Sequence, residues 1–134
     1  MLASPSIGLA DPGSGATTGL FFARLLRDLG IADALKPRIR LFPDGTAAVE
    51  ALARGEVTLV MGQMSEIKSV AGADLVGPLP EGMQLRTVYA AGVLAHAPRP
   101  GAAQVVIAFL RSPRTAPAFA AAGFDLPEAR PARP

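Results

Sequence analysis

The sequence predicts an α/β fold: an open, mostly parallel sheet flanked by helices. Between residues 6 and 70, apolar strand-like runs alternate with segments of helical periodicity. Turns rich in glycine and proline separate them. The run at 57–61 is apolar throughout except for one threonine, which is typical of a strand covered on both faces in a parallel sheet.

The first predicted strand covers residues 6–10 and ends in the turn Asp-Pro-Gly-Ser-Gly at 11–15. Proline fixes φ and glycine permits positive φ, so this stretch favours a tight turn. Residues 16–29 then show helical spacing, and Gly30 is suited to end that helix. The positions expected to face the core are Leu20, Ala23, Leu26 and Leu29.

Two further strand–helix pairs follow. Residues 38–42 alternate charged and apolar side chains, which indicates a half-exposed strand. We expect Thr46 to cap a helix that reaches Arg54. The run at 57–61 is the third strand, and residues 65–67 begin a short helix.

The C-terminal part of the sequence predicts two more strands and two more helices. The expected strands are at 74–79 and 87–95, and the expected helices are at 101–110 and 115–122. The second strand is rich in alanine and valine, and Ser-Pro separates the two helices.

Composition excludes several classes of protein. The net charge is +2, the basic residues are dispersed, and one tyrosine and no tryptophan are present, which argues against nucleic-acid binding. The absence of cysteine excludes disulfides, and no cluster of histidines offers a transition-metal site, so we expect no metal and no cofactor. No apolar run approaches a membrane span, and residues 1–5 lack the positive start of a signal peptide.

The turn at 11–15 is the main candidate site. A strand, a glycine-rich bend and a helix N-terminus in that order make a cradle for an anion, because the first N–H groups of the helix point outward. We expect the N–H groups of this bend to stay available to a ligand, with further neutral donors at the carboxyl ends of the strands. These donors are Ser14, Thr17, Thr18, Gln63 and Ser65. The alternative is a turn that needs glycine for its geometry and binds nothing.

Catalytic arrangements are less well supported. His96 is the single histidine and is expected at the surface, while Asp11 and Glu66 are better explained as a turn residue and a residue at a helix N-terminus. Residues 13–19 read GxGxxxG, one residue longer than the dinucleotide fingerprint, with Asp44 near the place of a ribose-binding acid. We expect no enzyme, and a nucleotide-binding enzyme remains an alternative.

Short motifs also follow one another in a characteristic order. They are Ala-Asp-Pro at 10–12, Thr-Gly-Leu-Phe at 18–21, Ala-Arg-Gly-Glu-Val at 53–57, Gly-Gln-Met-Ser-Glu-Ile at 62–67, Leu-Val-Gly-Pro-Leu-Pro at 75–80, Tyr-Ala-Ala-Gly-Val at 89–93 and Ala-Phe-Leu-Arg-Ser-Pro at 108–113. Their order and spacing resemble the type II periplasmic solute-binding proteins, above all the molybdate-binding components of ABC transporters. Such proteins have two α/β lobes with the ligand between them, and this chain resembles the second lobe plus the C-terminal return into the first.

The resemblance implies specific ligand contacts. Thr18 takes the place of an alanine whose N–H meets the oxyanion, Gly62 supplies a second backbone donor, and Tyr89 matches a tyrosine whose hydroxyl contacts the ligand. Threonines at 17 and 18 replace Pro-Ala, and Gln63 replaces a tyrosine, so a molybdate-like oxyanion, a carboxylate and another small polar solute all stay open. The complete predicted ligand-binding set is Ser14, Thr17, Thr18, Gly62, Gln63, Ser65 and Tyr89.

The same resemblance implies an ABC transporter membrane component as partner and a periplasmic location. The chain as written shows no export signal and would stay in the cytoplasm.

The alternative function is a truncated, self-associating remnant without a ligand, because an apolar strand and helix without partners favour a homodimer or larger homo-oligomer. The expected parts are a ligand-binding α/β lobe at 1–86, a crossing strand with two helices of a truncated first lobe at 87–126, and a flexible tail at 127–134.

Overall fold

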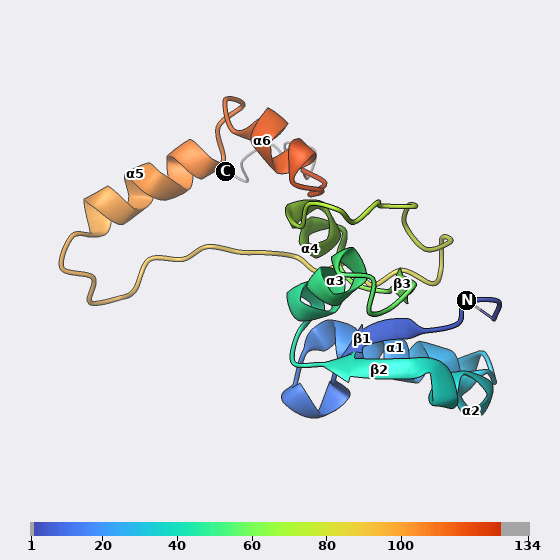
Figure 1. Cartoon of the computed structure of the whole chain (residues 1–134). Coiled ribbons are helices and arrows are strands. Elements are labelled where there is room, and N and C mark those ends of the chain that lie inside the picture. Colours follow the sequence, from blue (N-terminus) through green and yellow to red (C-terminus); the bar gives the residue numbers. More distant parts are fainter. Residues whose placement is uncertain (1, 127–134) are drawn as a thin grey trace. The chain divides into compact units, whose positions relative to one another are not determined.

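The computed structural model describes residues 2–126, which form two compact units that divide between Leu85 and Arg86. The first unit is a three-stranded parallel sheet with helices packed on both faces (Figure 1). Its strands are β1 (Ile7–Ala10), β2 (Ile39–Phe42) and β3 (Leu59–Val60). Its helices are the 3-10 turns η1 (Pro12–Ser14) and η2 (Lys36–Arg38) and the α-helices α1 (Thr17–Asp28), α2 (Ala32–Leu35), α3 (Gly45–Ala53) and α4 (Met64–Ser69).

The sheet has the strand order β2-β1-β3, and both pairs of strands are parallel. Ile7 of the central strand lies opposite Ile39 and Leu59, and Ala10 lies opposite Phe42. The predicted parallel α/β sheet is therefore confirmed. All three strands end at the same edge, which brings the loops that follow them together.

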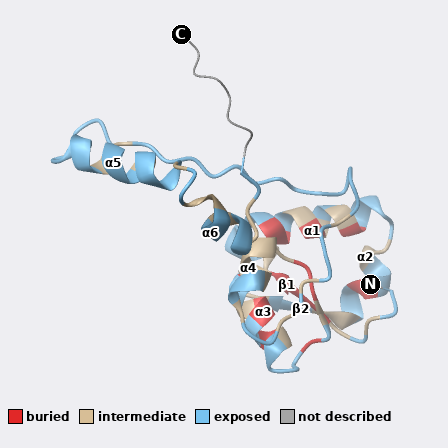
Figure 2. Cartoon of the chain, turned by 90° about the horizontal axis from the view of Figure 1, so that it is seen from above, coloured by how far each residue is buried: buried red, intermediate tan, exposed pale blue. Residues whose placement is uncertain are grey.

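The core occupies both faces of the sheet. On the face covered by α1 and α2 the buried residues are Ile7, Leu9, Phe22, Leu26, Leu35 and Met61. On the face covered by α3 they are Ala48, Val49, Ala51, Val57 and Val60. Gly8 separates Ile7 from Leu9 and points to the α3 face, where an added Cβ would lie 3.1 Å from a methyl group of Val60. Figure 2 shows the buried residues in these elements.

Helix α1 buries Leu26 as predicted, but the rest of its buried stripe differs from the prediction. Its buried positions are Thr18, Gly19, Phe22 and Leu26, whereas Leu20 and Leu29 are 55% and 41% exposed. The residues at 18, 22 and 26 recur every four positions, so they form one row along the helix. Packing of this row places the first turn of α1, including Thr18, against the end of β1.

The N-cap of helix α3 lies two residues before the predicted cap, Thr46. Asp44 has an extended backbone, with φ −151° and ψ 177°, and its Oδ1 accepts the N–H of Ala47 at 2.8 Å. Asp44 is therefore the N-cap, and the prediction of Thr46 is wrong because Thr46 already lies inside the first helical turn.

The predicted strands at 74–79 and 87–95 do not form. The second of these is the expected C-terminal strand. Neither segment pairs with a strand in the part of the chain that the structure describes, and both run as irregular chain (Figure 1). Strand formation requires a neighbouring strand to accept its hydrogen bonds, and an apolar run alone does not supply one.

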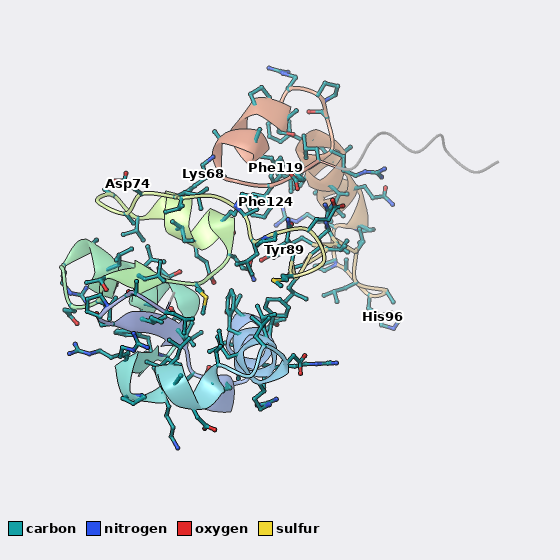
Figure 3. The ribbon with its side chains drawn as sticks, turned by 90° about the vertical axis from the view of Figure 1, so that its right-hand side faces the viewer. Lys68, Asp74, Tyr89, His96, Phe119 and Phe124 are labelled. Atoms are coloured by element: carbon teal, nitrogen blue, oxygen red, sulfur yellow. The ribbon has the colours of Figure 1, made fainter. Side chains whose placement is uncertain are left out.

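The second unit contains the two predicted C-terminal helices, α5 (Pro100–Leu110) and α6 (Ala116–Ala121). The rings of Tyr89 and Phe119 each meet the ring of Phe124 edge-on, with centroids 5.5 and 5.8 Å apart (Figure 3). No residue between 86 and 126 is buried (Figure 2). The expected tail at 127–134 lies outside the described residues, and no helix within 2–126 is long and apolar enough to cross a membrane.

Candidate functional site

The loops after β1, β2 and β3 meet at the carboxyl edge of the sheet. The Asp11 N–H donates to the carbonyl of Phe42 at 2.7 Å, which joins the loop after β1 to the end of β2. The chain passes from β1 to β2 on one side and later to β3 on the other, so the topological switch point lies between β1 and β3. Ligands of open α/β sheets bind at such a point. The loops beside it carry Ser14, Thr17, Thr18, Gly62, Gln63 and Ser65.

The glycine bend itself has no spare N–H groups between Gly13 and Ala16. Gly13 donates to Asp11 Oδ1 at 2.8 Å, Ser14 to the Asp11 carbonyl at 3.1 Å, Gly15 to the Pro12 carbonyl at 3.4 Å and Ala16 to Ser14 Oγ at 3.4 Å. The expectation that these groups stay available is therefore wrong, because Asp11 and the η1 turn satisfy them internally. The hydroxyl of Ser14 also donates to the Asp11 carbonyl, at 2.7 Å.

The first turn of α1 differs from the bend. The N–H groups of Thr17, Thr18 and Gly19 have no acceptor among residues 2–126. The N-cap, Ala16, offers no side-chain oxygen, and the first turn contains no acidic residue. Thr17 is exposed, Thr18 is 7% exposed, and Gly19 lies so close to β1 that an added Cβ would be 2.5 Å from the Ala10 carbonyl. The partial positive charge of this helix end is thus not matched by its own side chains.

The loop after β3 is shaped by a capping box. Gln63 is the N-cap of α4, and its N–H donates to Oε2 of Glu66 at 3.2 Å. Gly62, Gln63 and Ser65 are all half-buried. The Gln63 side chain in turn accepts the Glu66 N–H, and these reciprocal contacts account for Gln63 and Glu66 as local structure.

Glu66 has a second contact that the sequence did not predict. Its carboxylate lies against the Cα of Gly45, the buried first residue of α3, and a Cβ at Gly45 would overlap it. A Cβ at Gly62 would lie 3.4 Å from the same oxygen, Oε2. Glu66 therefore joins the loops after β2 and β3.

Most of the remaining candidate residues have contacts within their own segments. Tyr89 belongs to the second unit, where its ring meets Phe124. His96 is exposed in the same unit (Figure 3). Asp11 and Glu66 each accept an N–H of their own loop, and Asp44 caps α3, which explains all three without catalysis or a ribose. Within residues 2–126 no three acidic, histidine or cysteine side chains are grouped as metal ligands.

Comparison with known proteins gives the family. Residues 2–125 match the family described as bacterial extracellular solute-binding protein. The chain belongs to this family. The family prediction made from the ordered motifs is confirmed, and the binding of a solute is the role that the family description states.

Two individual proteins extend the comparison. A protein named aconitate isomerase, from a Pseudomonas species, is 30% identical over 120 residues, which cover 88% of this chain and 45% of the relative. The structure of the periplasmic molybdate-binding protein of Azotobacter vinelandii matches with a TM-score of 0.70 and 22% identity, over 94% of this chain and 56% of that chain. The second match shows a shared fold, and the chain spans about half the length of both proteins.

Proposed function

We propose that the first unit binds a small anionic solute, a carboxylate or a molybdate-like oxyanion, at the carboxyl edge of the sheet between β1 and β3. The ligand contacts would come from backbone N–H groups and hydroxyls of Thr17, Thr18, Gly62, Gln63 and Ser65, with Ser14 shaping the bend. The ligand contact of Tyr89, which belongs to the second unit, stays a prediction from the family resemblance. The role is binding and delivery of the solute, without chemical change.

The single observation that carries this proposal is the first turn of α1. Its three N–H groups lack protein acceptors among residues 2–126, and they lie at the start of α1, beside the switch point. Hydrogen bonds of this kind to a charged group contribute about 1.5–3 kcal/mol each. A twelve-residue helix adds its dipole, which favours negative charge at this end.

The donors at this edge also support binding over catalysis. The hydroxyls of Thr17, Thr18 and Ser65 are neutral, and the nearby carboxylates of Asp11 and Glu66 accept N–H groups of their own loops. The relative named aconitate isomerase supports a carboxylate as the solute, and the matching molybdate-binding protein supports an oxyanion. Membership of the family supports a place outside the cytoplasm and delivery of the solute to an ABC transporter.

Thr17→Pro tests the backbone contact directly. Thr17 is the first residue of α1, a position where proline fits the helix, and Ala16 already has the extended backbone that a residue before proline prefers. The substitution removes one N–H that has no protein acceptor. Calorimetric titration with molybdate, sulfate, lactate and aconitate should show at least about tenfold weaker binding of the preferred anion.

Thr17→Ala is the matched control, because it removes the hydroxyl and keeps the N–H. It should weaken binding less than Thr17→Pro, and both variants should unfold at the same urea concentration as the natural protein. Equal affinities of Thr17→Pro and the natural protein would contradict the proposed site. Absence of binding to all four anions would contradict the proposed function.

For the second unit we propose self-association into a homodimer or larger homo-oligomer. None of its residues between 86 and 126 is buried, and α5 exposes Val105, Val106 and Phe109 at 68%, 56% and 54%. Apolar side chains gathered on one helix are costly to leave in water, so a second copy would stabilise them.

A further inference from the structure

Thr18 is the buried polar side chain of residues 2–126, and neither of its hydrogen-bond donors has an acceptor there. The residue is 7% exposed. Its N–H and its hydroxyl both lack a partner in the described part of the chain. Because a buried donor without an acceptor costs free energy, native proteins satisfy nearly all such groups. Two unused donors on one buried residue therefore point to an acceptor from outside the chain.

The position of Thr18 directs these donors to the carboxyl edge of the sheet. Thr18 is the second residue of α1, and the Cα–Cβ bond of a helical residue tilts toward the helix N-terminus. Gly19 lies against the backbone of Ala10 and Pro12, so the Thr18 side chain starts beside the end of β1. Within residues 2–126 the fully enclosed side-chain oxygen without a partner is that of Ser112, so the Thr18 hydroxyl keeps a path to the surface.

The other hydroxyls at this edge have less to gain from a ligand. Ser14 Oγ already donates to the Asp11 carbonyl at 2.7 Å. Thr17 is exposed, so water satisfies its hydroxyl, and Ser65 is half-buried. A hydrogen bond from Thr18 replaces little contact with water and forms in a less polar environment, where it is stronger.

We infer that Thr18 is the affinity-determining residue of the proposed site, and that its N–H and its hydroxyl donate to the oxygens of one carboxylate or oxyanion group. This inference rests on the proposed function. The empty protein leaves both donors unpaired, so the hydroxyl contributes to binding and not to the stability of the empty protein. A hydroxyl with a structural role would show the reverse.

Thr18→Val tests this directly, because valine has nearly the shape of threonine and lacks the hydroxyl. Calorimetric titration of the full chain with molybdate, sulfate, lactate and aconitate should show at least about tenfold weaker binding of the preferred anion. Without ligand, the variant should unfold at the same urea concentration as the natural protein or at a higher one. The reason is that a methyl group replaces a buried hydroxyl that has no partner.

Two further variants complete the test. Thr18→Ser keeps the hydroxyl and loses the methyl group, so it should bind within about threefold of the natural protein and unfold at a lower urea concentration. Thr17→Val is the matched control, because it removes an exposed hydroxyl from the same helical turn. It should weaken binding by no more than about threefold.

The outcomes separate the inference from the proposed function. If Thr18→Val binds as tightly as the natural protein, or if it loses stability without ligand, the inference is overturned, while binding through the Thr17 N–H would stand. Nuclear magnetic resonance of the natural protein needs no variant. On addition of the preferred anion, the Cβ and methyl resonances of Thr18 should shift more than those of Thr17, and the opposite order would also overturn the inference. Absence of binding to all four anions would overturn both.

Discussion

At the scale of single residues, the acidic side chains at the carboxyl edge of the sheet are explained by local structure. Asp11 accepts the N–H of Gly13, Asp44 that of Ala47 and Glu66 that of Gln63. Each bond satisfies a donor that a turn or helix start leaves without a partner. The same bonds fix the loops after β1, β2 and β3 at one edge of the sheet.

Gly19 is the residue where the backbone leaves no room for a side chain. An added Cβ would lie 2.5 Å from the carbonyl oxygen of Ala10 and 2.9 Å from the nitrogen of Pro12, and both are backbone atoms that cannot move aside easily. Gly19→Ala should therefore lower the free energy of unfolding by about 1–3 kcal/mol, although alanine is the better helix former. Urea unfolding followed by circular dichroism measures this change.

Gly101→Ala is the control for Gly19→Ala. Gly101 also lies in the first turn of a helix, α5, but an added Cβ there meets no atom within 4 Å. This variant should unfold at the same urea concentration or slightly higher, by up to about 1 kcal/mol. A Gly19→Ala protein as stable as Gly101→Ala would show that α1 does not pack against β1 as described.

At the scale of elements, the sequence predicted the helices better than the strands, because a helix depends mainly on residues within its own segment. The helices near 17–28 and 100–110 were predicted because apolar spacing and turn residues act within the segment itself. The strands expected at 74–79 and 87–95 were wrong because pairing depends on residues far along the chain. In the candidate site, the glycines predicted correctly where the loops lie. They did not predict the hydrogen bonds that satisfy the N–H groups between Gly13 and Ala16.

The start of α3 gives a prediction at the element scale. Asp44→Ala removes the oxygen that accepts the Ala47 N–H and should cost about 0.5–2 kcal/mol of stability. Thr46→Ala, at the position that sequence reasoning chose as the cap, should change stability by less than about 0.5 kcal/mol because Thr46 is exposed. Urea unfolding of the two variants decides between the caps, and a larger loss in Thr46→Ala would contradict the structure.

At the scale of the whole molecule, the two units differ in how well they bury their apolar side chains. The first unit has a core on both faces of its sheet, whereas the second has no buried residue between 86 and 126. The chain spans 45% and 56% of the length of the two compared proteins. A unit of this kind gains stability when another surface covers it, which is the physical basis for the proposed self-association.

Helix α5 provides the test of that proposal. Val106→Glu places a charge among the exposed apolar residues of α5, and a buried, unpaired charge in an interface would be costly. Light scattering of the natural protein at micromolar concentration should give a mass of twice the 13.7 kDa chain or more, and Val106→Glu should lower it toward one chain. Gln104→Glu adds the same charge at a polar position of the same helix and should leave the assembly intact. If the natural protein has the mass of a single chain, self-association is contradicted. If both variants lower the mass equally, net charge controls the assembly rather than contact through α5.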